Sequence, residues 1–215
     1  MSYDRHIHHR IDYTKLKLLE EEAPTDPMEL FAEWLRMAEE DQVEEPHAMT
    51  LSTAGSITIS SRVVLLRAFD REGFVFYTNY NSRKAMDLER DPRAALCFFW
   101  SAHERQVRVE GRAEKIGTEE SDRYFNSRPR ESRIGAWSSD QSRMVRDRSQ
   151  LEDRYRRWVE RFADLEEIPR PLHWGGYRIK PVRIEFWQGR ASRMHDRIAY
   201  EKMSDDGWEM MRLQP

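Results

Sequence analysis

The sequence predicts a mainly β, α+β protein in which small helices decorate an antiparallel β-barrel. Three observations lead to this fold class. At least five short segments of β character follow one another, turn residues separate them, and short helical patterns interrupt the series. Neither an internal repeat nor a low-complexity linker divides the 215 residues, which are enough to bury a sizeable core.

The chain is predicted to begin with a mobile arm that leads into a helix. Residues 1–26 are polar and become acidic toward their end, which indicates an arm, and residues 27–215 then form a single domain. Between residues 27 and 40 apolar side chains recur at helical spacing, and Thr25 and Asp26 are candidates for the N-cap. We therefore expect a helix that packs one apolar face against the barrel.

The remaining elements follow from alternation, turn signals and helical spacing. Strands are predicted over residues 48–53, 57–69, 73–79, 93–100 and 105–116, and closing strands over 177–187, 197–203 and 208–213. Helices are predicted over 82–90, 118–125 and 149–163, the last with Leu151, Tyr155, Trp158, Val159 and Phe162 as its apolar stripe. A turn is predicted at Ser127-Arg-Pro-Arg130.

Composition excludes several classes of function. The formal net charge is only −3, so no overall field attracts nucleic acid or a membrane surface. The sequence has no signal-peptide pattern and no long apolar run, which indicates a cytoplasmic protein. Cys97 lies in an apolar run and is expected in the core. No metal site is predicted, because no Cys/His pair has zinc spacing and His6, His8 and His9 cluster in the arm.

Arginines need a second observation before they indicate a site. Of the 36 basic residues 30 are arginine, a bias that can come from coding composition alone. Arg83 and Lys84 have such support, because they fall in the first turn of a predicted helix that Ser82 could cap. Cations there oppose the helix dipole, so their placement indicates a bound anion such as a phosphate. Arg62 and Arg67 bracket a neighbouring apolar strand.

A second group of residues indicates a second anion site. Tyr124 and Arg128 are four residues apart on a predicted helix, and Ser132 follows them. Gln106 lies on a strand, where its amide could serve the edge of a heteroaromatic ring, although a solvated glutamine is the more common case. Two anion sites indicate two phosphorylated ligands, a cofactor and a substrate.

The segment from Trp187 to Arg197 carries a different pattern. Arg193, His195 and Arg197 recur at every second residue after a glycine turn. On an extended backbone these side chains share one face, so we expect two guanidiniums and an imidazole to point together just beyond a tryptophan. That combination suits a flat, anionic, ring-bearing ligand.

Four stretches of the chain, taken in order, are individually distinctive. They are Phe76–Asn79 with Ser82–Lys84, Arg105–Gly111, Ser127–Arg130 with Ile134–Trp137, and His173–Tyr177 with Ile184–Gly189. Their order and spacing resemble the pyridoxamine 5′-phosphate oxidase family, also called pyridoxine 5′-phosphate oxidase. The resemblance extends over nearly the whole chain, from Arg10 to Pro215. It implies a split β-barrel homodimer that binds FMN in two clefts at the subunit interface.

The resemblance also implies roles for individual residues. FMN is expected to bind Arg62, Val63, Val64, Leu65, Leu66, Arg67, Tyr77, Thr78, Arg83, Lys84, Gln106, Gln141, Ser142, Trp187 and Arg197. The substrate is expected to bind Arg10, Tyr13, Arg67, Tyr124, Arg128, Ser132, Arg193, Met194 and His195, with Arg10 and Tyr13 closing over it. Arg193 and His195 are the expected catalytic residues.

The implied reaction is oxidation of pyridoxamine or pyridoxine 5′-phosphate to pyridoxal 5′-phosphate by dioxygen, with release of hydrogen peroxide. Two positions depart from the family pattern: Arg67 stands where lysine is usual, and Met194 where leucine is usual. Two alternatives stay open, a split-barrel flavoenzyme acting on another ring, as in phenazine assembly, and a non-catalytic module that binds FMN or pyridoxal phosphate. Nucleic-acid binding is disfavoured by the balanced charge.

Overall fold

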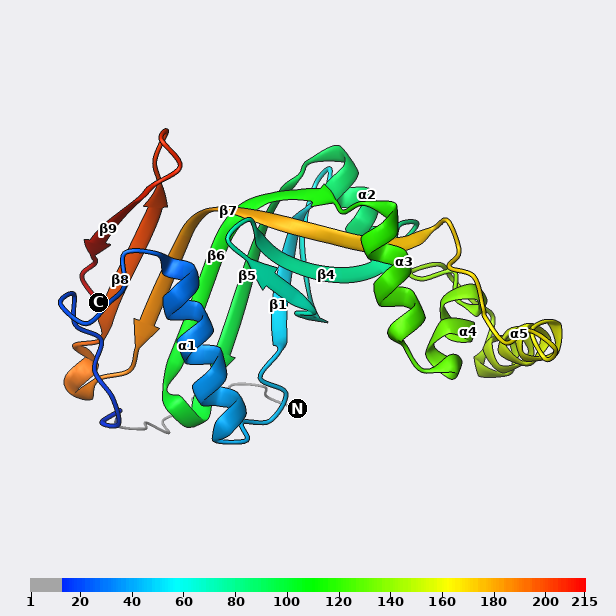
Figure 1. The fold of residues 1–215 in the computed structure, drawn as a ribbon, viewed down its shortest axis with the longest axis horizontal. Coiled ribbons are helices and arrows are strands. Elements are labelled where there is room, and N and C mark those ends of the chain that lie inside the picture. Colours follow the sequence, from blue (N-terminus) through cyan, green and yellow to red (C-terminus); the bar gives the residue numbers. More distant parts are fainter. Residues whose placement is uncertain (1–12) are drawn as a thin grey trace, which may run out of the picture. The chain divides into compact units, whose positions relative to one another are not determined.

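The computed structural model describes residues 13–215, which form an α+β fold built on an antiparallel sheet (Figure 1). Neighbouring strands follow the order β2-β1-β5-β6-β7-β4-β3, and β8 pairs with both β7 and β9. The strands are β1 Ala48–Ala54, β2 Ile59–Leu65, β3 Ala68–Asp70, β4 Gly73–Asn79, β5 Arg93–Trp100, β6 Arg105–Lys115, β7 Trp174–Gln188, β8 Asp196–Lys202 and β9 Trp208–Arg212. The helices are α1 Pro27–Glu40, α2 Arg83–Arg90, α3 Thr118–Ser127, α4 Arg130–Ser138 and α5 Arg148–Arg161.

The structure differs from the predicted elements at one strand and adds one helix. The single strand expected over 57–69 is two strands, because the chain changes partners between them: Leu66 N–H donates to His47 and Arg67 N–H to Val75. The turn predicted at Ser127–Arg130 is confirmed, since α3 ends at Ser127 and Pro129 is the N-cap of α4, but helix α4 itself was not predicted.

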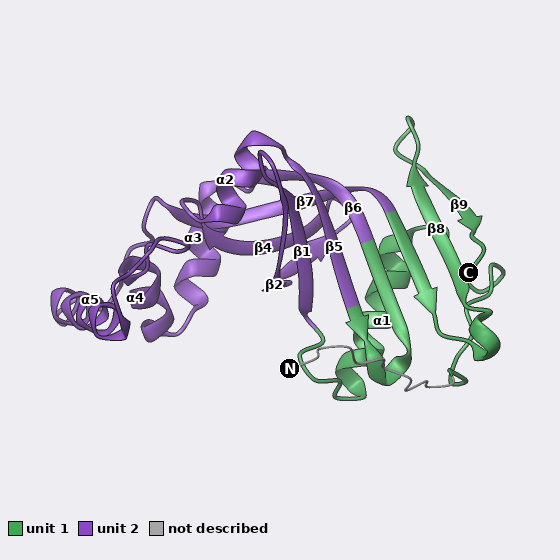
Figure 2. Cartoon of the chain, turned by 180° about the vertical axis from the view of Figure 1, so that it is seen from behind, with its two compact units in different colours: residues 1–46, 99–108, 184–215 green, residues 47–98, 109–183 purple. Residues whose placement is uncertain are grey.

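The chain separates into two compact units (Figure 2). Unit 1 comprises residues 1–46, 99–108 and 184–215, and unit 2 comprises residues 47–98 and 109–183. Because β5, β6 and β7 continue from one unit into the other, the same strands supply residues to both.

Unit 1 is organised around helix α1. Asp26 caps the helix by accepting a hydrogen bond from Met28 N–H at 2.9 Å, as the sequence predicts. Trp34 of α1 is fully buried and packs edge-on against Phe186, with ring centroids 5.2 Å apart. The guanidinium of Arg105 lies 4.2 Å from the Trp34 ring and donates to Gln188 at 2.9 Å, so burial of this charge is compensated by a π face and a hydrogen bond.

Unit 2 holds a second core formed by helices α3 and α4 and the segment around Trp174. Its buried members are Phe125, Ile134, Ala136, Phe162, Ile168 and Trp174. Tyr155 and Trp158 of α5 pack against this cluster, but Leu151 and Val159 are about two-fifths exposed. The predicted apolar stripe of α5 is therefore only partly covered, and no residue of this helix is buried.

The described part of the N-terminal segment contacts unit 1. Leu18 is buried, Lys15 Nζ donates to Ala102 O at 2.6 Å, and Tyr200 Oη donates to Pro24 O at 2.8 Å. The mobile arm over residues 1–26 and the single domain over 27–215 stay predictions.

Residues 13–215 contain neither a membrane-spanning helix nor a cluster of metal-ligating side chains. No helix in this range has the length and apolar character needed to cross a membrane. The same range contains no group of three or more His, Cys, Asp or Glu side chains placed to hold a metal ion. His6, His8 and His9 lie outside the described residues.

Candidate functional site

A cavity of about 490 Å³ opens in unit 2, a size typical of small-molecule sites. Four of its lining side chains are cationic and none is acidic, which gives the cavity a strongly positive character. The lining residues are Arg62, Val63, Val64, Leu65, Arg67, Tyr77, Thr78, Asn79, Lys84, Tyr124, Arg128, Gly135, Ala136, Ser139, Gln141 and Trp174. They come from β2, β4, α2, α3, α4, the start of β7 and the connections between these elements.

Lys84 is the most buried cation of this cavity. Ser82 caps α2 and thereby fixes Lys84 in its first turn, where the positive end of the helix dipole opposes a cation. Its Nζ lies 3.2 Å from Thr78 Oγ1, 3.3 Å from Gln141 Oε1 and 3.5 Å from Ser82 Oγ, all uncharged groups. Burial, together with the nearby charge of Arg62, lowers the pKa of Lys84. An anionic ligand would supply the missing counter-charge.

Arg128 is held by a column of aromatic rings. Tyr77 stacks on Tyr124 with centroids 3.9 Å apart and on Trp174 at 5.4 Å, and the Arg128 guanidinium lies 4.6 Å from the Trp174 ring. Its buried Nη1 has no hydrogen-bond partner within the described residues. Burial lowers the pKa of Arg128, and its neighbours act in opposite directions: Tyr124 raises the pKa and Arg67 lowers it. The stack thus fixes a guanidinium that has an unused donor.

The cavity unites residues expected in two separate anion sites. Arg62–Leu65, Tyr77, Thr78, Lys84 and Gln141 were expected to bind the cofactor, Tyr124 and Arg128 the substrate, and Arg67 both. Leu66, Arg83, Ser132 and Ser142 do not line it; Arg83 instead donates to Thr58 at 3.2 Å. Sequence reasoning missed Asn79, Gly135, Ala136, Ser139 and Trp174. Trp174 lies in a motif already recognised as distinctive, which was the available signal.

Unit 1 brings together three of the predicted ring-binding residues. The Trp187 and His195 rings have centroids 4.7 Å apart. Tyr13 packs edge-on against both, at 5.7 Å from Trp187 and 5.9 Å from His195. A Cβ on Gly189 would lie 2.7 Å from Tyr13 Cγ, so glycine there leaves room for the tyrosine. Arg10, the other residue of the predicted closure, lies outside the described residues.

Arg193, His195 and Arg197 do not share one face of a strand, contrary to the prediction. Ala191–Arg193 forms a 3₁₀ turn, and β8 begins only at Asp196. Ser192 and Arg193 are left-handed, with φ of 56° and 62°, a conformation that costs about 1–3 kcal/mol for a residue other than glycine. Strain of this kind often marks a functional position, and here it turns the exposed Arg193 out of the strand.

His195 has a defined hydrogen-bonding arrangement. Its Nδ1 lies 3.0 Å from the Arg190 backbone nitrogen and accepts that N–H, so the neutral ring carries its proton on Nε2. Desolvation and the positive charge of Arg193 lower the pKa of His195, against an opposing effect of Asp196. The imidazole is therefore neutral near pH 7 and can donate a hydrogen bond from Nε2.

The positive charge of Arg197 is compensated by a carboxylate of the protein, Glu185. Arg197 donates to Glu185 at 2.9 Å and to the Gln214 carbonyl at 2.8 Å, and Glu185 also lies 3.2 Å from Arg108. Glu185 is buried, so it fixes the guanidinium direction of Arg197. Sequence reasoning did not identify this carboxylate. Gln106 is half-buried on β6, and Met194 is 68% exposed.

The fold, together with comparisons to known proteins, defines a split-barrel enzyme. Residues 35–162 match the family model described as pyridoxamine 5′-phosphate oxidase, and residues 174–215 match the pyridoxine 5′-phosphate oxidase C-terminal dimerisation region. The chain belongs to the pyridoxine/pyridoxamine 5′-phosphate oxidase family.

Individual relatives agree with this assignment. The chain is 50% identical over 207 residues to the pyridoxine/pyridoxamine 5′-phosphate oxidase of Trichormus variabilis, with 96% of each chain covered. It is 53% identical to that of Bordetella avium, covering 96% of this chain and 97% of the relative. A crystal structure of PhzG from Burkholderia lata, in complex with tetrahydrophenazine-1-carboxylic acid, has a TM-score of 0.87 at 30% identity and covers 94% of this chain and 99% of PhzG.

Proposed function

We propose that this enzyme oxidises pyridoxine and pyridoxamine 5′-phosphate to pyridoxal 5′-phosphate with bound FMN. The observation that carries the proposal is the positive cavity, in which Lys84 and Arg128 lack anionic partners among the described residues. Relatives about 50% identical over nearly the whole chain are oxidases of these two compounds by name, which supports the same substrates here.

The residues present fit an FMN phosphate. Lys84 supplies a buried ammonium, and Arg62, which lines the same cavity, is already oriented by its hydrogen bond to Thr53 at 2.8 Å. Thr78 and Gln141 add a hydroxyl and an amide within reach of Lys84. A relative of the same fold from Nostoc punctiforme, 14% identical with a TM-score of 0.69, is described as FMN-binding. By family resemblance Gln106, Trp187 and Arg197 would contact the flavin ring.

The remaining cations suit the substrate. Arg128, whose free Nη1 faces no internal acceptor among the described residues, and Arg67 would bind its 5′-phosphate together with Tyr124. Arg67 replaces the usual lysine and keeps the positive charge, but its planar fork favours two-point contact with a phosphate. His195 would donate from Nε2 to a polar atom of the pyridine ring, and Arg193 would lie against the same ring.

Bound FMN would supply the redox chemistry, which is acceptance of a hydride from substrate C4′ and transfer of two electrons to dioxygen to give hydrogen peroxide. The protein orients the substrate and handles the proton. The 4′ hydroxyl or amine must lose a proton as C4′ is oxidised, and Arg193 would position this group. Pyridoxine phosphate then gives the aldehyde directly, whereas pyridoxamine phosphate gives an imine that water hydrolyses to the aldehyde and ammonia.

We further propose a homodimer with FMN at the subunit interface. The match of residues 174–215 to a dimerisation region supports the dimer. Several large apolar side chains of unit 2, including Ile57, Ile59 and Val63, are more than half exposed in the single chain, which is consistent with a covered surface in an assembly. A cytoplasmic location stays a prediction.

The alternative of another ring substrate rests on the structural likeness to PhzG. The test is to purify the protein, record flavin absorbance, and add pyridoxine 5′-phosphate under air while following peroxide and aldehyde. We expect bound FMN and equal amounts of both products. Bound FMN without turnover would contradict the oxidase and favour the other-substrate or carrier alternatives.

A further inference from the structure

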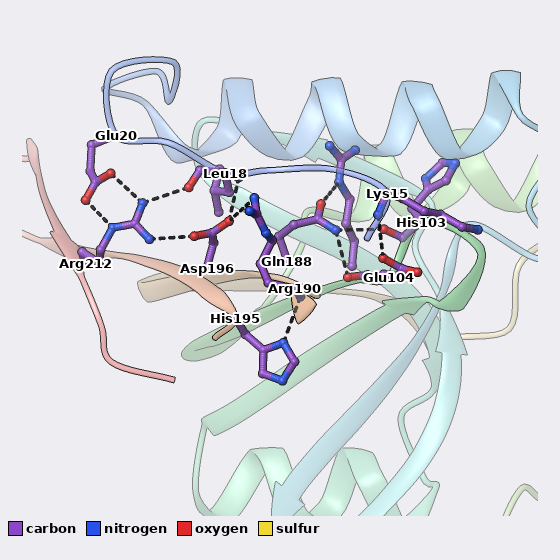
Figure 3. A network of polar contacts seen from close by, with 11 residues as sticks. Lys15, Leu18, Glu20, His103, Glu104, Gln188, Arg190, His195, Asp196 and Arg212 are labelled. Carbon is purple, nitrogen blue, oxygen red and sulfur yellow. Dashed lines mark hydrogen bonds and ion pairs between the residues drawn. The ribbon is translucent and has the colours of Figure 1, made fainter. Parts of the chain in front are cut away.

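Asp196 stands at the centre of a polar network in unit 1 (Figure 3). Its side chain is 15% exposed and accepts three hydrogen bonds. Arg212 Nη1 donates to Oδ1 at 3.0 Å, whereas Leu18 N–H and Arg190 Nη1 donate to Oδ2 at 3.2 and 3.4 Å. One carboxylate therefore connects the N-terminal segment, the turn before β8 and the last strand.

The first branch leads to Tyr13. Leu18 is held from two sides, because its N–H binds Asp196 and its carbonyl accepts from Arg212 Nη2 at 2.9 Å. Arg212 also forms a two-point ion pair with Glu20, and this pairing lowers the pKa of Glu20 to about 2. These contacts fix residues 18–20, which follow Tyr13 by five to seven positions. The Tyr13 ring in turn packs on Trp187 and His195.

The second branch leads to His195. Arg190 binds Asp196 through its side chain and donates its backbone N–H to His195 Nδ1. The ion pair thereby holds the backbone that selects the Nε2–H tautomer of His195. In Figure 3 the imidazole projects away from the network, with its Nδ1 directed to Arg190.

We propose that Asp196 is a positioning residue for the substrate ring, fixing Tyr13 through Leu18 and Arg212 and fixing His195 through Arg190. This inference rests on the proposed function, which supplies the ring that the two side chains address. Asp196 would not touch the substrate; it would set the places of two groups that do.

Asp196→Asn is the informative variant, because an amide offers one acceptor oxygen where the carboxylate uses two. In the ligand-free protein we expect backbone amides of residues 15–20 to exchange with deuterium about tenfold faster, and the Nε2–H tautomer of His195 to lose population in ¹⁵N NMR. In the FMN-loaded enzyme we expect KM for pyridoxine 5′-phosphate to rise about tenfold, with the FMN dissociation constant within twofold of wild type.

Two further variants separate the branches. Arg212→Gln should accelerate exchange of residues 15–20 and leave the His195 tautomer unchanged, whereas Arg190→Gln should do the reverse. Glu40→Gln, which removes an exposed ion pair with Arg36 on α1, is the matched control and should change neither readout.

The proposal is overturned if Asp196→Asn leaves exchange and tautomer as in wild type, or if FMN affinity falls in step with KM, which would indicate general loss of structure. The ligand-free measurements need no turnover. If the wild type fails to oxidise pyridoxine 5′-phosphate, the proposed function fails, while exchange and tautomer still decide whether Asp196 positions both groups.

Discussion

The cavity of unit 2 and the segment around His195 in unit 1 differ in how far their cations are compensated. In the cavity, Lys84 contacts only neutral groups and Arg128 keeps a donor unused, counting the described residues, and Arg62 has Asp87 at 3.9 Å. In unit 1, Arg197 is paired with Glu185, and Arg190 and Arg212 are paired with Asp196. Uncompensated cations indicate where a phosphate would bind, and compensated cations hold neighbouring groups in place.

Arg193 is the instructive exception in unit 1. It is exposed, its backbone is left-handed, and none of the described residues forms an ion pair or hydrogen bond with it. A cation displayed in this way is available to a ligand, whereas its neighbour Arg197 is already paired with Glu185. We therefore propose that phosphate binding belongs to unit 2 and ring positioning to unit 1, a division that substitutions in each unit can test.

The largest expected effect is on cofactor binding. Lys84→Gln removes the buried ammonium and should weaken FMN binding by about 10–100-fold, the loss expected for a charge-assisted hydrogen bond. Titration of the apoprotein with FMN, followed by flavin fluorescence, measures this. Lys115→Gln, which disrupts an exposed ion pair with Glu89, is the control. Equal affinity in Lys84→Gln and wild type would remove Lys84 from the phosphate site.

Loss of a compensating carboxylate should instead lower stability. Glu185→Gln leaves Arg197 and Arg108 without their buried counter-charge and should reduce the free energy of unfolding by about 1–2 kcal/mol. Arg108 is 45% exposed, so solvent screens its share of the loss. Urea denaturation with an unchanged m-value would support this result. A variant as stable as wild type would show that the pairing only orients Arg197.

The packing of Tyr13 predicts a smaller effect. Gly189→Ala places a methyl group against the Tyr13 ring and should displace it, which costs about 0.5–1.5 kcal/mol of aromatic contact and raises KM about 2–10-fold. Gly117→Ala, where an added Cβ meets no atom within 4 Å, is the matched control. Unchanged steady-state kinetics in Gly189→Ala would argue against a role for Tyr13 at the substrate ring.

The smallest effect concerns pH. Because the folded pKa of His195 lies below its ordinary value of about 6.5, the neutral form persists through pH 7. Protonation at lower pH adds a proton to Nδ1 and breaks the hydrogen bond from Arg190 N–H. KM should therefore rise as the pH falls through the lowered pKa of His195 in the folded protein. The unfolded state binds the proton more readily, so stability should fall in the same direction. His195→Gln should remove this part of the KM profile, and a persistent rise would assign it elsewhere.

Local sequence patterns predicted most of the helices and strands, but they did not predict polar contacts between residues far apart in the chain. Ser82 caps α2 as predicted, and of the two cations after it Lys84, but not Arg83, lines the cavity. Glu185 and Asp196 could not be identified, because their partners lie far along the chain, at Arg108 and at Leu18. The left-handed turn at Ser192 and Arg193 was missed because neither residue is glycine or asparagine, the usual signals.

The stack of aromatic rings that holds Arg128 was not predicted from local patterns either. Tyr124 and Arg128 were predicted to share a helix face, yet Arg128 ends the helix and is held instead by Trp174, 46 positions further along the chain. Helical spacing cannot reveal such a partner. The resemblance to the family provided the residues expected to act in the site, and the structure added the side chains that hold them.

The division between the two units is tested most directly by FMN titrations of Arg193→Ala and Arg62→Ala, with the initial rate of peroxide formation measured at saturating FMN. The account predicts that Arg193→Ala keeps FMN affinity close to wild type but loses most of its turnover, and that Arg62→Ala loses affinity but recovers turnover once saturated. If both variants lost flavin to the same degree, the assignment of phosphate binding to the cavity and ring positioning to the Arg193 turn would be contradicted.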